Sequence, residues 1–242
     1  MFKLDSWINP AKLDPYFLSA NPRAILYLEE NPHMLDWAGL SKNPEAVHVL
    51  QRNLDKVCWW QLSTNASAIH ILKDNPDKII WDGLSRNSAA IDMLLQNQEQ
   101  INWAIINENP AALPLLKDNP DKINWSWMSN NIGAIELIKE NMNSIDWVMI
   151  SCNPAAIDII EENKDKICFW LLSSNKAAIH ILKEFVLDVS WEILSENESI
   201  FVYDYERMKS TIAPFLEELI ARTMHPARIQ SWLDAGMSID DI

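Results

Sequence analysis

The chain has 242 residues, of which 48% are hydrophobic and 22% charged, and its formal net charge at pH 7 is −14. This composition is typical of a folded chain, and no stretch reaches the roughly 18 apolar residues that a membrane helix needs, so no membrane partner is expected. The acidic balance argues against direct nucleic-acid binding, for which a basic patch is the usual footprint.

The first 20 residues are expected to form an N-terminal cap. Charges and a proline stand where a secretion signal has its apolar run, so we expect an intracellular protein. Residues 13–19, LDPYFLS, align with the second half of the repeat described below, with Pro15 at the position of its tryptophan. Residues 1–20 are therefore interpreted as a cap with a degenerate half repeat.

Residues 21–196 repeat every 22 residues without insertion or deletion. An asparagine begins each of eight units and recurs after the last, at Asn21, Asn43, Asn65, Asn87, Asn109, Asn131, Asn153, Asn175 and Asn197. Three positions after each of the first eight stands an alanine, then an aliphatic residue, and three further on another aliphatic residue. This spacing lines one face of a helix.

A second asparagine stands ten residues after the first in seven units, and Phe185 replaces it in the eighth. Both asparagines are often followed by proline, as in Asn21-Pro22 and Asn31-Pro32. Asparagine at the N-cap with proline at the first helical position is a helix-start signal. Each unit is therefore expected to start two short helices.

The second half of the unit carries a column of large aromatic residues: Trp37, Trp59, Trp81, Trp103, Trp125, Trp147, Phe169 and Trp191. This column predicts an aromatic ladder in the core, and buried asparagines are expected to bond loop backbone and their counterparts in the next unit. Short helices do not persist alone, so the units are expected to stack. The predicted fold is an all-α solenoid of eight 22-residue repeats, each of two short helices. A β-solenoid is the competing architecture, disfavoured by helical spacing and by only four glycines.

Residues 197–242 depart from the repeat and are interpreted as a helical C-terminal cap that seals the last unit. Phe215, Leu216, Leu219 and Ile220 indicate one amphipathic helix. A second helix is expected from Pro226 to Ala235, ended by Gly236.

The pattern NPxAIxxLxxNPDKIxWxxLSxNP, as in Asn109 to Ser129, resembles repeats in proteins of giant DNA viruses of the mimivirus and marseillevirus kind. The tail segments HPARI at 225–229 and WLDAG at 232–236 are also similar to blocks in that group. The resemblance implies a viral protein that acts in the infected cell, in the host cytoplasm or a viral compartment, or in the virus particle. It supplies no catalytic residues to carry over.

Little in the sequence indicates chemistry. It holds no phosphate loop, nucleophile elbow or HExxH motif, and its three cysteines lack CxxC spacing, so no enzyme, cofactor or metal site is expected. His48, His70 and His180 share one repeat position, where neighbours stand roughly 10 Å apart, too far for one metal ion. We expect a solvated helix face there, with a metal-binding or pH-sensing role as the alternative.

Positions that vary while their neighbours do not are where repeat proteins bind partners. The position after the aromatic column reads Ala38, Trp60, Asp82, Ala104, Ser126, Val148, Trp170 and Glu192. Trp60 and Trp170, with Trp127 one position along, are extra to the ladder and are the first candidates for partner binding, unless they fill gaps between helices. The second candidates are His48, His70 and His180.

Two functions stay open at this point. One is a non-enzymatic protein–protein interaction scaffold that binds a host or viral protein, and the other is a structural component of a virion or assembly. The first predicts a monomer with one varied face, the second self-association. A third idea, that the acidic rod imitates nucleic acid, requires negative charge spaced regularly along one face.

Overall fold

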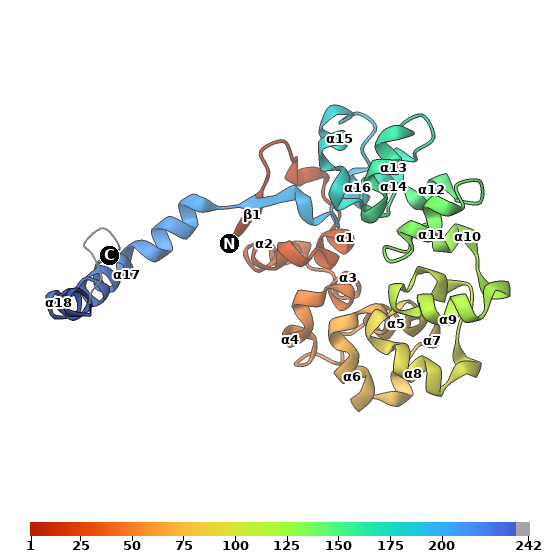
Figure 1. Cartoon of the computed structure of the whole chain (residues 1–242), viewed down its shortest axis with the longest axis horizontal. Coiled ribbons are helices and arrows are strands. Elements are labelled where there is room, and N and C mark those ends of the chain that lie inside the picture. Colours follow the sequence, from red (N-terminus) through yellow and green to blue (C-terminus); the bar gives the residue numbers. More distant parts are fainter. Residues whose placement is uncertain (236–242) are drawn as a thin grey trace. The chain divides into compact units, whose positions relative to one another are not determined.

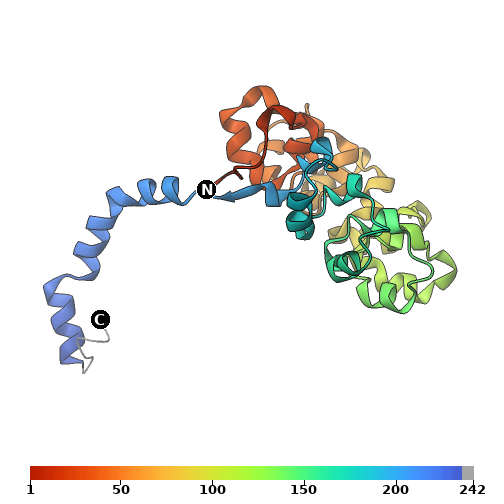
Figure 2. The ribbon, with the colours of Figure 1, turned by 90° about the horizontal axis from the view of Figure 1, so that it is seen from above.

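The computed structural model describes residues 1–235 (Figures 1 and 2). They fall into two compact parts: residues 4–201, and residues 1–3 together with the chain from residue 202 onward. The predicted all-α repeat architecture is confirmed, since short helices recur along the chain and the strands of the described part are β1 (Phe2–Leu4) and β2 (Phe201–Tyr203). Among residues 1–235, no helix is long and apolar enough to span a membrane.

In seven of the eight units of residues 21–196, a 3-10 turn leads into a first α-helix, and the unit that begins at Asn131 has its first helix without such a turn. The first helices are α2 (Ile25–Glu30), α4 (Val47–Leu50), α6 (Ile69–Asp74), α8 (Ile91–Gln96), α9 (Leu113–Asp118), α11 (Ile135–Glu140), α13 (Ile157–Glu162) and α15 (Ile179–Glu184). The turns before them include η2 (Pro22–Ala24), η4 (Pro44–Ala46), η5 (Ala66–Ala68), η7 (Ser88–Ala90), η10 (Pro110–Ala112), η12 (Pro154–Ala156), η13 (Lys176–Ala178) and, at the end of the series, η14 (Glu198–Ile200).

A second helix follows in each unit. These second helices are α1 (Pro15–Ala20), α3 (Trp37–Lys42), α5 (Trp59–Thr64), α7 (Trp81–Arg86), the 3-10 helix η9 (Ile105–Glu108), α10 (Trp125–Met128), α12 (Trp147–Ile150), α14 (Phe169–Leu172) and α16 (Trp191–Leu194). The 3-10 turns that come before several of them are η1 (Pro10–Lys12), η3 (Pro32–Met34), η6 (Pro76–Lys78), η8 (Gln98–Gln100) and η11 (Pro120–Lys122).

The two asparagine columns have different roles, which corrects the prediction that both are N-caps. Asn65, of the first column, accepts from the N–H of Ser67 at 3.1 Å and so caps the start of η5. Asn75, of the second column, donates instead to the carbonyl of Ile71 at 2.9 Å and makes no N-cap bond. The second asparagine therefore satisfies a carbonyl that the end of the first helix leaves without a partner.

Each first-column asparagine also joins its unit to the unit before. The amide nitrogen of Asn87 donates to the carbonyls of Ser63 and Asn65 at 2.9 and 3.1 Å, and its oxygen accepts from the N–H of Ala89. The same pattern recurs at Asn43, Asn65, Asn109, Asn131, Asn153, Asn175 and Asn197. These buried asparagines form a ladder through the units, as the sequence predicts.

A serine column makes a second ladder beside the first. The hydroxyl of Ser63 donates to the carbonyl of Trp59 and accepts, at 3.1 Å, from the N–H of Ile80 in the next unit. Asn107 stands where the other units have serine, and its amide makes both bonds: it donates to the carbonyl of Trp103 and accepts from the N–H of Asn124. Asn107 therefore keeps both bonds of the serine ladder, although the second helix of its unit is the 3-10 helix η9.

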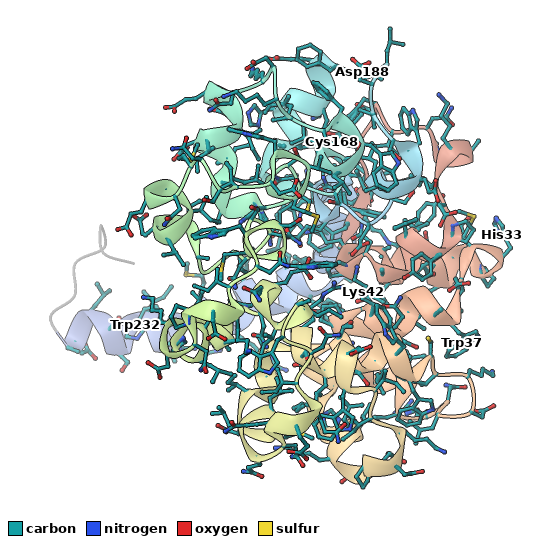
Figure 3. All side chains as sticks on the ribbon, turned by 90° about the vertical axis from the view of Figure 1, so that its right-hand side faces the viewer. His33, Trp37, Lys42, Cys168, Asp188 and Trp232 are labelled. Carbon is teal, nitrogen blue, oxygen red and sulfur yellow. The ribbon has the colours of Figure 1, made fainter. Side chains whose placement is uncertain are left out.

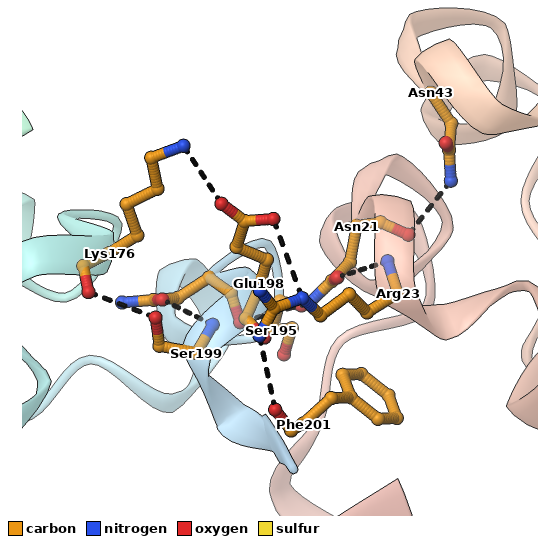
Figure 4. Close-up of polar contacts among 9 residues, drawn as sticks. Asn21, Arg23, Asn43, Lys176, Ser195, Glu198, Ser199 and Phe201 are labelled. Atoms are coloured by element: carbon orange, nitrogen blue, oxygen red, sulfur yellow. Dashed lines mark hydrogen bonds and ion pairs between the residues drawn. The ribbon is translucent and has the colours of Figure 1, made fainter. Parts of the chain in front are cut away.

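Both ladders continue from the last units of residues 4–201 to the first, so this segment forms a closed ring of nine units. The amide nitrogen of Asn21 donates to the carbonyls of Ser195 and Asn197, both at 3.0 Å, and the hydroxyl of Ser195 accepts from the N–H of Asp14 at 2.9 Å. In Figure 3 the colours of successive units run in a full circle. Figure 4 shows the junction, where the carboxylate of Glu198 lies 2.9 Å from Lys176 and 3.6 Å from Arg23.

The ninth unit is assembled from two distant segments. Asn197 and η14 supply its beginning, and Asn9, η1 and α1 supply its second half, with no α-helix at residue 201 or residues 4–8. The sequence predicts caps at residues 1–20 and 197–242, whereas residues 4–20 and 197–201 bond to each other within the ring. Such a closure arises because the small rotation between units adds up to a full turn after nine units.

The aromatic column lies at the margin of the core. Its tryptophans are half-buried, which differs from the predicted core ladder, while the position three residues on is fully buried in every unit, as at Leu40, Leu62 and Leu84. Lysines cover several of the rings: Lys56 lies 4.8 Å from the ring centroid of Trp37 and Lys166 lies 4.7 Å from that of Trp147. Lys12 covers Trp191 in the same way across the junction.

The smaller part contains the strand pair and two helices. The N–H of Asp204 donates to the carbonyl of Met1, the rings of Phe2 and Tyr203 stack at 4.9 Å, and Lys3 pairs with Asp204. The helices α17 (Tyr205–Thr223) and α18 (Pro226–Asp234) follow, drawn in blue in Figures 1 and 2. Both were predicted; Gly236, the predicted helix stop, and the side chain of Leu219 lie outside what the structure describes.

We expect Asn87→Ala to lower the free energy of unfolding by about 3 kcal/mol, because it leaves two buried carbonyls and one N–H without partners. Asn97→Ala is the matched control, since Asn97 is half-buried and donates only to the carbonyl of Met93, and about 1 kcal/mol is expected. Urea denaturation measures both. Equal losses in the two variants would contradict the central place of the first-column ladder.

We expect Asn21→Ala to cost as much as Asn87→Ala, about 3 kcal/mol, because Asn21 makes the same bonds to Ser195 and Asn197 across the junction. In an open solenoid Asn21 would have no access to those carbonyls. A loss well below 1 kcal/mol in urea denaturation would show that the ring is open in solution.

Candidate functional site

The first candidate residues lie on one face of the second helices. Trp60 and Trp170 occupy the second position of α5 and α14. Four residues after each comes the residue that directly precedes a first-column asparagine, Thr64 after Trp60 and Ser174 after Trp170. Residues four apart share a helix face. The second-helix face is the name we give to the face formed in all units by the position of Trp60 and Trp170 together with the position four residues later.

Trp60 and Trp170 are exposed to 41% and 56% of their full surface. They are therefore not needed to fill gaps between helices, which was the alternative interpretation. Trp60 and Trp170 are 110 residues apart, which is five units in one direction around the nine-unit ring and four in the other. The ring consequently holds them on opposite sides, as two separate contact points.

Trp127 is placed differently from these two. It is half-buried, and the guanidinium of Arg86 lies 5.9 Å from its ring centroid. Its column also holds Gly39 and Gly83, where neighbouring second helices approach so closely that a Cβ on Gly39 would lie 2.0 Å from the carbonyl oxygen of Tyr16. Trp127 therefore packs between helices and offers less free surface than Trp60 or Trp170.

The three histidines are exposed, as expected for a solvated face. His70 contacts the side chain of Gln51, and Nε2 of His180 lies 2.8 Å from the carboxylate of Glu161. Both partners stand 19 residues earlier, so the two contacts are the same bridge between adjacent units. Among residues 1–235, no three His, Cys, Asp or Glu side chains are grouped so as to hold a metal ion.

The residues that precede the first-column asparagines form a continuous row, which we call the belt: Ala20, Lys42, Thr64, Arg86, Glu108, Asn130, Cys152, Ser174 and Glu196. Glu108 pairs with Arg86 and accepts from the amide of Asn130, whose oxygen in turn faces the Cys152 thiol at 3.2 Å. Burial, and then the charge of Glu108, raise the pKa of Cys152 to about 12.

The belt lies toward the middle of the ring. In Figure 3 Lys42, at the end of α3, lies nearer the middle than Trp37, at its start. Lys42 pairs with Glu196 across the small Ala20, which joins residues two units apart. Around this pair is a hollow of about 240 Å³, lined also by Pro22, Pro44, Ser174, Lys176 and Glu198. Its charges are mutually paired, which suits a structural role at the junction.

Residues 185–187 form an exposed apolar loop that was not predicted from the sequence. Here Phe185, Val186 and Leu187 replace the usual Asn-Pro-Asp, and Leu187 is 99% exposed.

Beside the loop is a hollow of about 290 Å³, lined by Asp5, Ser6, Trp7, Lys183 and Val186. Burial alone would raise the pKa of Asp5, but the bond and charge of Lys183, 2.7 Å away, and the Ser6 N–H lower it below its ordinary value. The replacement of Asn at position 185 was the available signal.

Comparison of the chain with protein-family models, curated proteins and solved structures gives no match.

We expect Cys152 to resist alkylation by iodoacetamide at pH 8 in the folded protein, because a thiol with a pKa of about 12 holds almost no thiolate at that pH. Mass spectrometry of a digest, with Cys58 and Cys168 in the same sample, measures the extent of labelling. In urea Cys152 should be alkylated, because burial and the nearby Glu108 are lost. Equal labelling rates with and without urea would contradict the packing of the belt.

Proposed function

We propose that this chain is a non-enzymatic protein–protein interaction scaffold that binds a partner protein through the second-helix face around Trp60 and Trp170. The exposure of these two large side chains supports the proposal. Exposed tryptophans are favoured anchors of protein interfaces, since they bury much area with few rotatable bonds. The face around them varies from unit to unit, with Asp82, Ser126 and Val148 exposed at the same position.

The closed ring also suits a scaffold. Nine hydrogen-bonded joints hold Trp60 and Trp170 at a fixed separation, so little conformational entropy is lost when a partner engages both. A partner that touches both points gains from their linkage, provided that its own contact points match the span.

The net charge of −14 favours partners with basic surfaces. The resemblance to giant-virus repeats favours a partner in an infected cell, as a host or a viral protein. A role as a structural component of a particle rests on the same resemblance and stays the alternative.

We expect Trp60→Ala/Trp170→Ala to weaken partner binding at least tenfold, because an interface tryptophan commonly contributes about 2 kcal/mol or more. The tagged wild-type chain captures the partner from the cells that make it, and calorimetry on the purified pair then gives the dissociation constants. Both substitutions remove exposed side chains, so the unfolding free energy should change by no more than about 1 kcal/mol.

Leu54→Ala/Leu95→Ala is the matched control. Both leucines are exposed large apolar residues of the ring, and neither lies on the second-helix face. This variant should bind like the wild type. Unchanged affinity of the double-tryptophan variant, or equal loss in both variants, would reject the second-helix face as the binding site.

A further inference from the structure

An exposed carboxylate stands beside each of the two exposed tryptophans. At the same repeat position one unit further on, Trp60 is followed by Asp82 and Trp170 by Glu192. All four side chains are exposed. Asp82 and Glu192 are 110 residues apart, as are the two tryptophans, so the ring carries the same combination twice. We call Trp60 with Asp82, and Trp170 with Glu192, the aromatic–acidic pairs.

The two members of each pair lie on neighbouring second helices. Helices α5 and α7 approach so closely that a Cβ on Gly83 would lie 2.7 Å from the carbonyl oxygen of Trp60, and Asp82 directly precedes Gly83. At the second pair the N–H of Ser190 donates to the hydroxyl of Ser173 at 3.0 Å, against 3.1 Å for the same bond at the first pair. Because these joints match and the members share one repeat position, ring and carboxylate lie side by side on the second-helix face.

The chain itself supplies no cation to these two carboxylates. Asp82 accepts a hydrogen bond from the neutral amide of Asn102 at 2.8 Å, which leaves its charge uncompensated. Within residues 1–235, neither Asp82 nor Glu192 forms an ion pair with a lysine or arginine. The cations of the belt are each paired with a glutamate of the belt: Lys42 with Glu196 and Arg86 with Glu108. The aromatic–acidic pairs are therefore negative places on a face whose other charges cancel.

The rings of Trp60 and Trp170 also lack the cation that several tryptophans of this ring have. Lysine nitrogens lie 4.8, 4.7 and 4.8 Å from the ring centroids of Trp37, Trp147 and Trp191. In the described part of the chain no lysine or arginine lies over Trp60 or Trp170 in this way. A cation within about 6 Å of an indole centroid is attracted to the ring. One cationic group could therefore satisfy both members of a pair.

We propose that each aromatic–acidic pair binds one arginine or lysine side chain of the partner protein, with the cation over the tryptophan ring and paired with the carboxylate one unit further on. Arginine suits both contacts at once, because its planar guanidinium stacks on an aromatic ring while its N–H groups donate to a carboxylate. This inference rests on the proposed function, since it names the chemistry by which the second-helix face recognises its partner. The net charge of −14 attracts the same class of partner.

Nuclear magnetic resonance of the full chain, labelled with ¹⁵N at its tryptophan indoles, tests the site with a blocked hexa-arginine peptide as the probe. The indole N–H signals of Trp60 and Trp170 are identified by their loss in Trp60→Phe and Trp170→Phe. Both signals should shift and saturate on titration, and a blocked hexa-glutamate peptide should leave them in place. Signals of Trp60 and Trp170 that stay unmoved by hexa-arginine would overturn the proposal.

The carboxylates are tested by Asp82→Asn/Glu192→Gln, which removes two charges and keeps the size of both side chains. The dissociation constant for hexa-arginine, taken from the two indole signals, should rise about fivefold. Asp77→Asn/Asp121→Asn is the matched control, because it removes the same charge from exposed positions outside the second-helix face. The control should change the constant by less than about twofold. Equal weakening in both variants would show general attraction to an acidic protein and overturn the proposal.

The captured partner separates this inference from the proposed function. Weaker binding of the partner by Trp60→Ala/Trp170→Ala and by Asp82→Asn/Glu192→Gln would support both. If only the tryptophan variant binds more weakly, the second-helix face is the partner site and recognition of a cation is wrong. If neither variant binds more weakly, both proposals fail.

Discussion

The amide group of the first-column asparagine is the interaction on which the rest of the structure depends. Its nitrogen donates to two carbonyls of the preceding unit, and its oxygen accepts an N–H of its own unit, as at Asn87. Aspartate lacks the donors and serine has only one, so neither could make all three bonds. Since the site is fully buried, any missing bond would leave a polar group without water or protein partner.

Uniform joints are what allow the ring to close. The bonds of Asn21 across the junction, both 3.0 Å, match those of Asn43 and Asn87 between consecutive units, which range from 2.8 to 3.1 Å. The beginning and the end of residues 4–201 are therefore joined by the same contacts as any two neighbouring units, through a ninth unit made of residues 4–20 and 197–201. Lysines over the aromatic column and the serine ladder repeat the same register at the junction.

Most of the repeat could be predicted from the sequence, because helices, buried asparagines and stacking each leave a residue type at a fixed position. Two features could not. The asparagine of an Asn-Pro pair can cap the start of the following helix or donate to a carbonyl at the end of the preceding helix. The sequence does not distinguish the two, and the structure shows that Asn75 donates back to the carbonyl of Ile71. Closure of the ring depends on the rotation between successive units, which no single repeat position specifies. A sequence sign of a ninth unit is that Asn9 and Pro15 stand at the repeat positions of the second asparagine and the tryptophan. The depth of the tryptophan column could not be predicted either, because a large aromatic residue at a fixed repeat position suits the core and its margin equally. The sequence therefore predicted a buried ladder where the tryptophans are half-buried.

Closure also changes what the exposed residues can do. In an open solenoid, residues 110 positions apart would lie far apart along a rod, and their separation would change as the rod flexes. In the ring, Trp60 and Trp170 face a common circumference, and every path between them runs through buried asparagine joints. Bending one joint must be compensated by the other eight, so the ring resists distortion more than a rod of equal length. The burial of nine asparagines thus stabilises the units and also fixes the geometry of the surface that they carry.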